Sequence, residues 1–342
     1  MSRKILMAFD DPGGGLVLTS LIEPLKSAGA ELKIYSGILS RKFAKNIEIE
    51  TLDSHIDKKT AGEIIDQFNP DLIITGTSAG RSEQELRNYA FENDKTSVVV
   101  LDFWKDYGRR WFYSDYGIEE MKDFVLVMDE FTKEEMAEEG FPGEKLIVTG
   151  HPYLDKIFNY GDNISAEAST SNKYLFLSQP LNVIGIKNFN IHPLEYLLKA
   201  LKDLSSEKEK INLTVKLHPV ENLSPELDDA VKKFKSENLN IRIVKNEESI
   251  EKLIEESDPV IGFNTIAMFE ARAKNKRTIS LKAVEVKESL NKAMLRAGIE
   301  IAEITKHDIP EILKKNTVSQ RPEDFFKGSI ENCKREILKL IN

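Results

Sequence analysis

Short apolar runs alternate with longer amphipathic segments along most of this chain. A short apolar run bounded by turn residues predicts a buried strand, whereas apolar positions that recur about every 3.6 residues predict a helix. The predicted strands are 4–9, 31–35, 71–75, 97–101, 124–128 and 145–148, and then 174–177, 212–217, 240–244, 259–262 and 278–281. The predicted helices are 16–28, 60–67, 82–93, 193–204, 226–237, 249–255 and 265–274, with two further helical stretches after 281.

This alternation predicts an α/β fold with two Rossmann-like, doubly wound parallel sheets, because a helix between two strands joins them as a right-handed crossover. A chain of 342 residues also exceeds one ordinary domain. The polar, aperiodic segment 160–173 separates the two series of strands and is the best candidate for a linker. We expect an N-terminal domain at 1–160, a C-terminal domain at 173–325, a cleft between them, and a last helix at 326–342 that packs back on the N-terminal domain.

Polar side chains follow several predicted strands of the first half. Asp10 and Asp11 follow the first strand, Thr77 and Ser78 come shortly after the strand that ends at residue 75, and Asp102 follows the next. Open α/β sheets bind ligands at the carboxyl ends of their strands. Asp11 and Asp102 are therefore the candidate catalytic carboxylates.

The string Asp10-Asp11-Pro12-Gly13-Gly14-Gly15 lies between the first strand and its helix. Glycines there allow close approach of a ligand, and a helix N-terminus favours anions, so Gly13 and Gly14 are candidate binding positions. The string lacks the glycine spacing of the dinucleotide fingerprint and the lysine of the Walker motif. The alternative is a tight turn in which an aspartate caps the helix. Two adjacent carboxylates favour function, because one cap uses one of them.

A histidine ends one strand of the second half, in Lys216-Leu217-His218-Pro219. Pro219 stops the strand and fixes the turn, so that His218 is presented at the edge of the sheet. Its imidazole can donate a hydrogen bond to a phosphate there.

Two more polar pairs follow strands of this half. Asn264 and Thr265 open the helix 265–274, whose free N–H groups suit an anion, although an N-cap role is the alternative. Ser178 and Gln179 suit a phosphate or a sugar hydroxyl, and the alternative for them is a polar turn ended by Pro180.

The loop from Asp102 to Trp111 combines a carboxylate, aromatic residues and the doublet Arg109-Arg110. Aromatic and arginine side chains can stack on sugar rings or bind anions. A loop that packs domains together is the alternative.

Composition narrows the function classes. A formal net charge of -9 argues against a general nucleic-acid binder. The single cysteine, Cys333, allows neither a disulfide within the chain nor a cysteine-based metal site, and no metal-ligand spacing occurs among the histidines and carboxylates. The sequence has no signal-peptide pattern and no apolar run of about 18 residues. We expect a cytoplasmic protein without a transmembrane segment, and peripheral membrane contact stays open.

The layout resembles the glycosyltransferase-B superfamily, which includes nucleotide-sugar glycosyltransferases and non-hydrolysing UDP-N-acetylglucosamine 2-epimerases. The segment Val148-Thr149-Gly150-His151-Pro152 with Asp155 is similar to the epimerase stretch before the hinge. The His218-Pro219 pair is similar to the His-Pro motif of bacterial sialyltransferases and polyol-phosphate polymerases. The segment Gly262-Phe263-Asn264-Thr265 with Glu270 lies where the family places its phosphate-binding helix.

The resemblance implies that a donor nucleotide binds to the C-terminal half, that an acceptor binds to the N-terminal half, and that neither a cofactor nor a metal is needed. The nucleotide-binding set that it implies is Ser178, Gln179, Lys216, His218, Pro219, Asn264, Thr265 and Glu270.

We therefore expect a glycosyltransferase that moves a sugar from a nucleotide-activated donor to a glycan or small-molecule hydroxyl, with Asp11 or Asp102 as the base. The chain departs from the epimerases at Leu177-Ser178-Gln179-Pro180, where they have Thr-x-His-Arg, and at 262–265, where they have Ser-Gly-Gly. A nucleotide-sugar epimerase or hydrolase is hence the alternative. A non-catalytic nucleotide-sugar-binding protein is a second alternative.

Overall fold

The chain forms two compact units. The structure, a computed structural model, describes residues 3–44, 47–53, 55–78, 80–160, 172–180, 193–207, 210–282, 286–304, 308–315, 322 and 324–341. Unit 1 comprises Met1–Tyr160, Lys287–Leu290 and Asp324–Asn342, and unit 2 comprises Gly161–Val286 and Asn291–Glu323. Most of the predicted linker, residues 161–171, lies outside the described residues.

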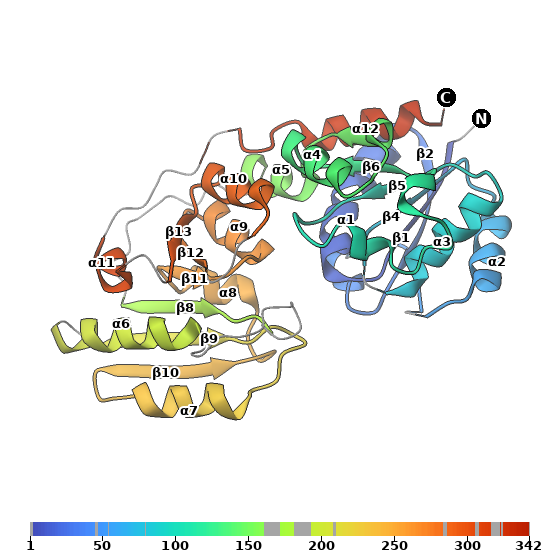
Figure 1. The fold of residues 1–342 in the computed structure, drawn as a ribbon. Helices are drawn as coiled ribbons and strands as arrows, with labels where there is room; N and C mark the ends of the chain where they lie inside the picture. The colour runs from blue at the N-terminus through green and yellow to red at the C-terminus, as the bar shows by residue number, and fades with distance from the viewer. Residues whose placement is uncertain are drawn as a thin grey trace. The chain divides into compact units, whose positions relative to one another are not determined.

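Unit 1 contains a seven-stranded sheet in the order β3-β2-β1-β4-β5-β6-β7 (Figure 1). Every strand pairs in parallel with its neighbours, and the order of the chain reverses between β1 and β4. Its strands are β1 (Arg3–Phe9), β2 (Ala30–Ser36), β3 (Glu50–Thr51), β4 (Leu72–Thr75), β5 (Ser97–Val100), β6 (Phe124–Val127) and β7 (Leu146–Val148). Its helices are α1 (Pro12–Ser27), α2 (Lys58–Phe68), α3 (Arg81–Glu92), α4 (Glu130–Glu138), α5 (Pro152–Asn159) and α12 (Ser329–Lys339), with the short 3-10 helices η1 (Arg41–Phe43), η2 (Gly108–Trp111), η3 (Ile118–Glu120) and η4 (Gly143–Lys145).

Unit 2 contains a six-stranded parallel sheet in the order β10-β9-β8-β11-β12-β13, which reverses between β8 and β11. The two sheets confirm the predicted pair of doubly wound α/β domains. Its strands are β8 (Lys173–Leu177), β9 (Ile211–Lys216), β10 (Leu239–Val244), β11 (Val260–Gly262), β12 (Thr278–Lys282) and β13 (Glu300–Glu303). Its helices are α6 (Pro193–Glu207), α7 (Pro225–Phe234), α8 (Ile250–Glu255), α9 (Ile266–Ala273) and α11 (Ile309–Lys314); α10 (Glu288–Arg296) has its first residues in unit 1.

The sequence prediction missed the strand β13, because it placed only helices after residue 281. It lies at the edge of its sheet, and only one of its four residues is buried. An edge strand with so little apolar character carries no clear alternating pattern.

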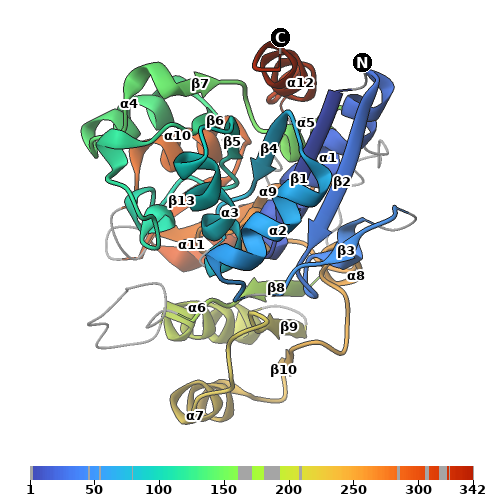
Figure 2. The same cartoon turned by 90° about the vertical axis from the view of Figure 1, so that its right-hand side faces the viewer.

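Helices cover both faces of the unit 1 sheet, as the alternation of side chains along β1 requires. Ile5 and Met7 share a core with α1 and with Cys333 and Ile337 of α12. Leu6 lies in a second core with residues of α2 and α3. The helix α12 packs beside α1 and α5 (Figure 2). The C-terminal segment thus completes the core of unit 1.

In unit 2, α6, α7 and α11 pack over the sheet in one apolar cluster that includes Phe176 of β8 and Val215 of β9. The helix α9 packs against β11 and β12. Within the described ranges, no helix combines the length and the apolar character that a membrane span needs.

The start of α1 corrects one prediction from the sequence. The helix begins at Pro12, so Gly13 and Gly14 form its first turn and not a loop before it. Asp11 is the N-cap and accepts a hydrogen bond from the Gly14 N–H at 2.8 Å, and Pro12 is tolerated at the first position because a first-turn N–H needs no helical partner. Propensity alone disfavours glycine here, and packing explains Gly13, because a Cβ there would clash with Oδ2 of Asp102.

We predict that Ile337→Ala in α12 lowers the free energy of unfolding by about 2–4 kcal/mol, because it leaves a cavity in the unit 1 core. Ile337 is 0% exposed. Urea unfolding measures the loss, and Arg335→Ala at an exposed position of the same helix is the control, expected within about 0.5 kcal/mol of the unchanged protein. Equal effects of the two changes would contradict the packing of α12.

Candidate active site

Three strand ends of unit 1 bring polar side chains together at one edge of the sheet, which we call the carboxyl edge of unit 1. Asp10 and Asp11 follow β1, Thr77 follows β4, and Asp102 follows β5. The strands β1 and β4 flank the point where the sheet order reverses, which is where open α/β sheets bind ligands. Arg110 of η2 reaches the same edge.

Asp11 is the N-cap of α1 and also lies at the carboxyl edge of unit 1, so the capping role leaves a role in a site open. Its Oδ1 caps α1 through the Gly14 N–H. Burial raises the pKa of the Asp11 carboxyl, and the neighbouring charge of Asp102 raises it further. We infer that Asp11 holds a proton at pH values where an exposed aspartate has lost it.

An arginine shifts the pKa of Asp102 in the opposite direction. Arg110 forms an ion pair with its Oδ1, and the Thr77 hydroxyl donates to the same oxygen at 2.9 Å. Burial alone would raise the pKa of Asp102, but the charge of Arg110 and these hydrogen bonds outweigh it and keep the pKa below its usual value. The side chain is 12% exposed, so a ligand can reach an ionised carboxylate here.

Arg110 also holds its own loop in place. Its Nε donates to the Lys105 carbonyl at 3.1 Å, while Nη1 contacts Thr77 and Asp102. The two arginines of the predicted doublet therefore differ in their environment: Arg109 is exposed, whereas the Arg110 side chain is 11% exposed. Trp104 and Trp111 are 0% and 3% exposed, so they belong to the protein interior and are not surfaces on which a sugar ring can stack.

Glu83, which sequence reasoning missed, lies under the carboxyl edge of unit 1. It is 0% exposed and accepts hydrogen bonds from the Asp10 N–H at 2.7 Å and the Ser78 N–H at 3.3 Å. Burial and the neighbouring Asp11 raise the pKa of the Glu83 carboxyl. One signal was present in the sequence: the start of α3, 82–88, contains one apolar residue, Leu86, so its buried face has to be polar.

His151 supports this edge from the inside. Its Nδ1 caps α5 by accepting from the Leu154 N–H, so its Nε2 is left to donate to the Asp102 carbonyl at 3.1 Å. The ring is fully buried and stacks on Trp104, with 5.5 Å between the ring centroids. Burial lowers the pKa of His151 to about 4, so the ring is neutral and structural at neutral pH.

The glycines of α1 press directly against this edge. A Cβ at Gly13 would clash with Oδ2 of Asp102, and a Cβ at Gly15 would lie 2.9 Å from the Cβ of Ser40. The space beside these two glycines is therefore filled by the protein's own side chains.

The carboxyl edge of unit 1 thus places Asp102, whose pKa is lowered, beside Asp11 and Glu83, whose pKa values are raised. Groups whose environments push their pKa values apart are suited to act as base and acid in one reaction. In the part of the chain that the structure describes, no three histidine, cysteine or acidic side chains are arranged to hold a metal ion.

The carboxyl edge of unit 2 carries a hydrogen-bonded polar network. The Ser178 hydroxyl donates to Oε1 of Glu221 at 2.8 Å, and the backbone N–H of His218 donates to Oε2 of the same residue at 3.1 Å. The Gln179 amide donates to the Asn264 carbonyl at 3.1 Å. The network brings the ends of β8, β9 and β11 together, and Glu221, three residues after His218, is the member that sequence reasoning missed.

The other predicted residues of unit 2 lie around this network. Thr265 occupies the N-cap position of α9 without a capping hydrogen bond from its side chain. The Lys216 amine contacts the Lys245 carbonyl at the end of β10, and Pro219 is exposed in the turn after β9. Glu270 lies farther along α9 and is half-buried. The strand ends thus gather Ser178, Gln179, His218 and Asn264, whereas Lys216 contacts the β10 side.

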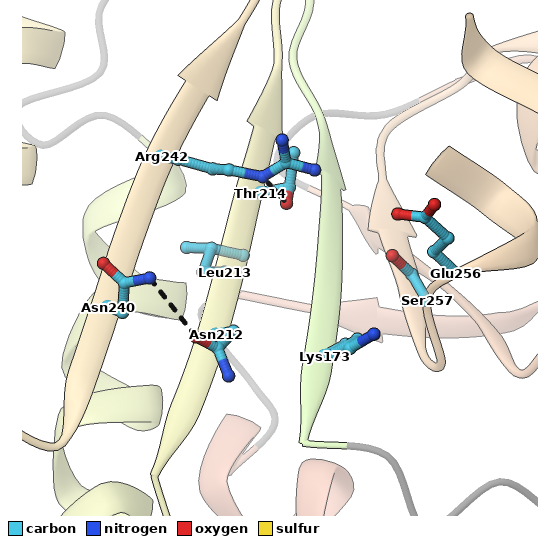
Figure 3. Close-up of a pocket in the computed structure, with 8 residues that line it drawn as sticks. All are labelled: Lys173, Asn212, Leu213, Thr214, Asn240, Arg242, Glu256 and Ser257. Carbon is cyan, nitrogen blue, oxygen red and sulfur yellow. Dashed lines mark hydrogen bonds between the residues drawn. The ribbon is translucent and has the colours of Figure 1, made fainter. Parts of the chain in front are cut away.

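A pocket of about 210 Å³ lies elsewhere in unit 2, along one face of β8, β9 and β10 (Figure 3). Asn240 and Asn212 are joined across it by a hydrogen bond of 3.2 Å. None of the predicted site residues is among those that line it: Lys173, Asn212, Leu213, Thr214, Asn240, Arg242, Glu256 and Ser257.

We predict that Gly13→Ala displaces the Asp102 carboxylate and lowers the free energy of unfolding by about 1–3 kcal/mol, because the new methyl group overpacks the site. Gly143→Ala is a matched control, since a Cβ there meets no atom within 4 Å. Thermal and urea unfolding of both variants test this, and a harmless Gly13→Ala would contradict the contact.

A second prediction concerns pH. The folded-state pKa of His151, about 4, lies below the ordinary histidine value of 6.5, so the stability that it contributes is present above pH 6.5 and is lost as the pH falls towards 4. His151→Asn keeps a capping side chain and removes the titration. Between pH 7 and pH 5, wild-type protein is expected to lose roughly 2 kcal/mol more unfolding free energy than His151→Asn in urea titrations. Parallel losses would show that His151 is not buried as a neutral ring.

Comparisons with known proteins bear on the fold. No protein-family model and no curated protein sequence matches the chain. Among solved structures, UDP-GlcNAc 2-epimerase from Methanocaldococcus jannaschii superposes with a TM-score of 0.70 at 11% identity, over 99% of each chain. UDP-GlcNAc 2-epimerase from Neisseria meningitidis, bound to UDP-GlcNAc, gives a TM-score of 0.65 at 13% identity, also over 99% of each chain.

A further match is the glycotransferase of kitacinnamycin, with a TM-score of 0.55 at 11% identity over 100% of this chain and 96% of the other. At such identities the likeness establishes the fold, and chemistry has to be argued from the site. The chain has the predicted glycosyltransferase-B type fold, with two Rossmann-like parallel-sheet domains and a partial likeness to the epimerases.

Proposed function

We propose that this chain is a nucleotide-sugar enzyme that changes the sugar without a glycan acceptor, as an epimerase or hydrolase. The observation that carries the proposal is that the pKa values of two carboxyl groups at the carboxyl edge of unit 1 are shifted in opposite directions. Arg110 keeps the pKa of Asp102 below its usual value, whereas burial raises the pKa of Asp11 to about 6, so Asp11 takes up a proton far more readily than Asp102.

This pairing suits a reaction that takes up one proton and returns another. Epimerisation beside the anomeric carbon gives the C2 proton to a base while the C1–O bond to the nucleotide breaks and takes the electron pair; re-addition of the nucleotide at C1 with a proton delivered to the opposite face of C2 completes the reaction. Hydrolysis needs a base to activate water and an acid to assist the leaving group. Transfer to a hydroxyl needs chiefly the base, so it makes less use of a protonated Asp11.

In the proposal, unit 2 holds the nucleotide. The His218 side chain and the start of α9 at Thr265 provide donors at the strand ends where diphosphates bind in open α/β sheets. The Ser178–Glu221 hydrogen bond keeps the β8 and β9 turns in a fixed geometry beside them. The full-length likeness to 2-epimerases, one of them bound to UDP-GlcNAc, supports UDP-GlcNAc as the first substrate to assay.

Glycosyl transfer is the second candidate. It is favoured by the accessible, ionised Asp102, which can deprotonate an acceptor hydroxyl, and by the likeness to a glycotransferase. In that case Asp102 is the base and Asp11 shapes the acceptor site.

The test is turnover of UDP-GlcNAc in D₂O with EDTA and without acceptor, followed by NMR. We expect either the 2-epimer with deuterium at C2 or free UDP with free sugar. Product that forms only after an acceptor is added would replace the proposal with glycosyl transfer. Tight nucleotide binding without any product, across UDP-, CDP-, GDP- and dTDP-sugars, would indicate a non-catalytic binding protein.

Variants separate the two units. Asp102→Asn removes the ionised carboxylate and is expected to lower kcat at least about 100-fold while nucleotide affinity changes little. His218→Ala is expected to weaken nucleotide binding about tenfold or more, as titration calorimetry with UDP measures. The assignment of roles would be wrong if Asp102→Asn lost UDP affinity and kept kcat.

A further inference from the structure

We propose that Glu83 is a positioning residue of the acid–base site: its buried carboxyl joins the turns after β1 and β4 and so fixes the place of Asp11 beside Asp102. The kinetic part of this inference rests on the proposed function. The structural part can be tested without turnover.

The geometry of Glu83 links two segments that are far apart in the chain. One carboxyl oxygen accepts from the Asp10 N–H at 2.7 Å, directly before Asp11. The other accepts from the Ser78 N–H at 3.3 Å, directly after Thr77. Thr77 is itself a hydrogen-bond donor to Asp102. The carboxyl of Glu83 therefore connects the backbone next to Asp11 with the backbone next to the hydrogen-bond partner of Asp102.

An ordinary helix-start role does not explain this arrangement. A glutamate in the first turn of a helix usually lies in solvent, where it complements the helix dipole or closes a capping box with the N-cap N–H. The N–H of the N-cap Gly80 instead bonds to the Ser78 hydroxyl, and α3 has no side-chain cap. Glu83 is 0% exposed and is directed across to β1.

Close packing transmits the position of Glu83 to Asp11. A Cβ at Gly76 would lie 3.1 Å from Oε2 of Glu83 and 3.1 Å from the Cα of Gly14. Gly14 in turn donates to the Asp11 carboxylate. A shift of the Glu83 carboxyl therefore moves the turn on which the Asp11 side chain depends.

Burial is the main reason that Glu83 holds its proton, and the charges around it modify the shift. Burial raises the pKa of Glu83 most, and Asp11 at the start of α1 raises it further. Arg87, one turn along α3, and the two backbone donors act in the opposite direction without reversing the shift. A neutral Glu83 adds no charge that would compete with Asp102 for Arg110.

The test uses Glu83→Asp in the full-length protein, because the shorter side chain cannot reach both N–H groups. Glu85→Asp is a matched control, since Glu85 is also buried on α3 but pairs with Arg81 at 2.6 Å. With UDP-GlcNAc, Glu83→Asp is expected to lower kcat about tenfold or more with KM changed less than about threefold, whereas Glu85→Asp keeps kcat within about twofold.

Carbon-13 NMR of the Asp11 carboxyl, assigned with Asp11→Asn, gives the second readout. In Glu83→Asp the Asp11 pKa is expected to fall towards its ordinary value, because the turn no longer holds the carboxyl in its buried place, and in Glu85→Asp it stays raised. An unchanged Asp11 titration in Glu83→Asp, or an equal shift in Glu85→Asp, overturns the inference. If wild-type protein turns over no nucleotide sugar, the proposed function fails while the NMR result still decides the role of Glu83.

Discussion

The ion pair between Arg110 and Asp102 is the interaction on which the carboxyl edge of unit 1 depends. Four acidic side chains, Asp10, Asp11, Glu83 and Asp102, lie at or under that edge, and burial opposes the ionisation of them all. Asp102 is the one of these four whose pKa lies below its usual value, because Arg110 pairs with it. The pKa values of the other three are raised. The same guanidinium binds the Lys105 carbonyl and so holds the loop that delivers it. Charge state and loop geometry are thus set by one side chain.

The doubly wound topology explains why this cluster forms where it does. In both units the sheet order reverses beside the first strand, β1 or β8, and the turns after the strands on either side of the reversal diverge. In unit 1 the space beside this point is filled by Asp11, Glu83 and the close contact of Gly14 with Gly76. In unit 2 the corresponding space holds the network of Ser178, Gln179 and Glu221. Related sheets therefore present different chemistry: four acidic side chains in unit 1, and hydroxyl, amide and imidazole groups around one carboxyl group, Glu221, in unit 2.

This difference supports a division of labour between the units in the proposed function. The cluster of carboxyl groups in unit 1 suits proton transfer at a sugar, whereas the hydroxyl, amide and imidazole groups around Glu221 in unit 2 suit phosphate oxygens. His151 illustrates the interior that such a site requires. It is a buried, neutral ring between α5 and the Asp102 carbonyl, and it supports the backbone after β5 without adding charge.

The sequence by itself determined the two-domain α/β fold and the strand ends at which polar residues gather, because periodicity and turn residues act over a few neighbouring positions. It also pointed to Asp11, Asp102, His218 and Asn264 as residues at strand ends. Only the tertiary structure decided that Arg110 and not Arg109 pairs with Asp102, and that the glycines of α1 pack against protein. It alone revealed Glu83, whose hydrogen bond to Asp10 spans 73 positions of the chain. Such contacts, and the pKa shifts that burial imposes, depend on which distant segments the fold brings together, and no local pattern records that.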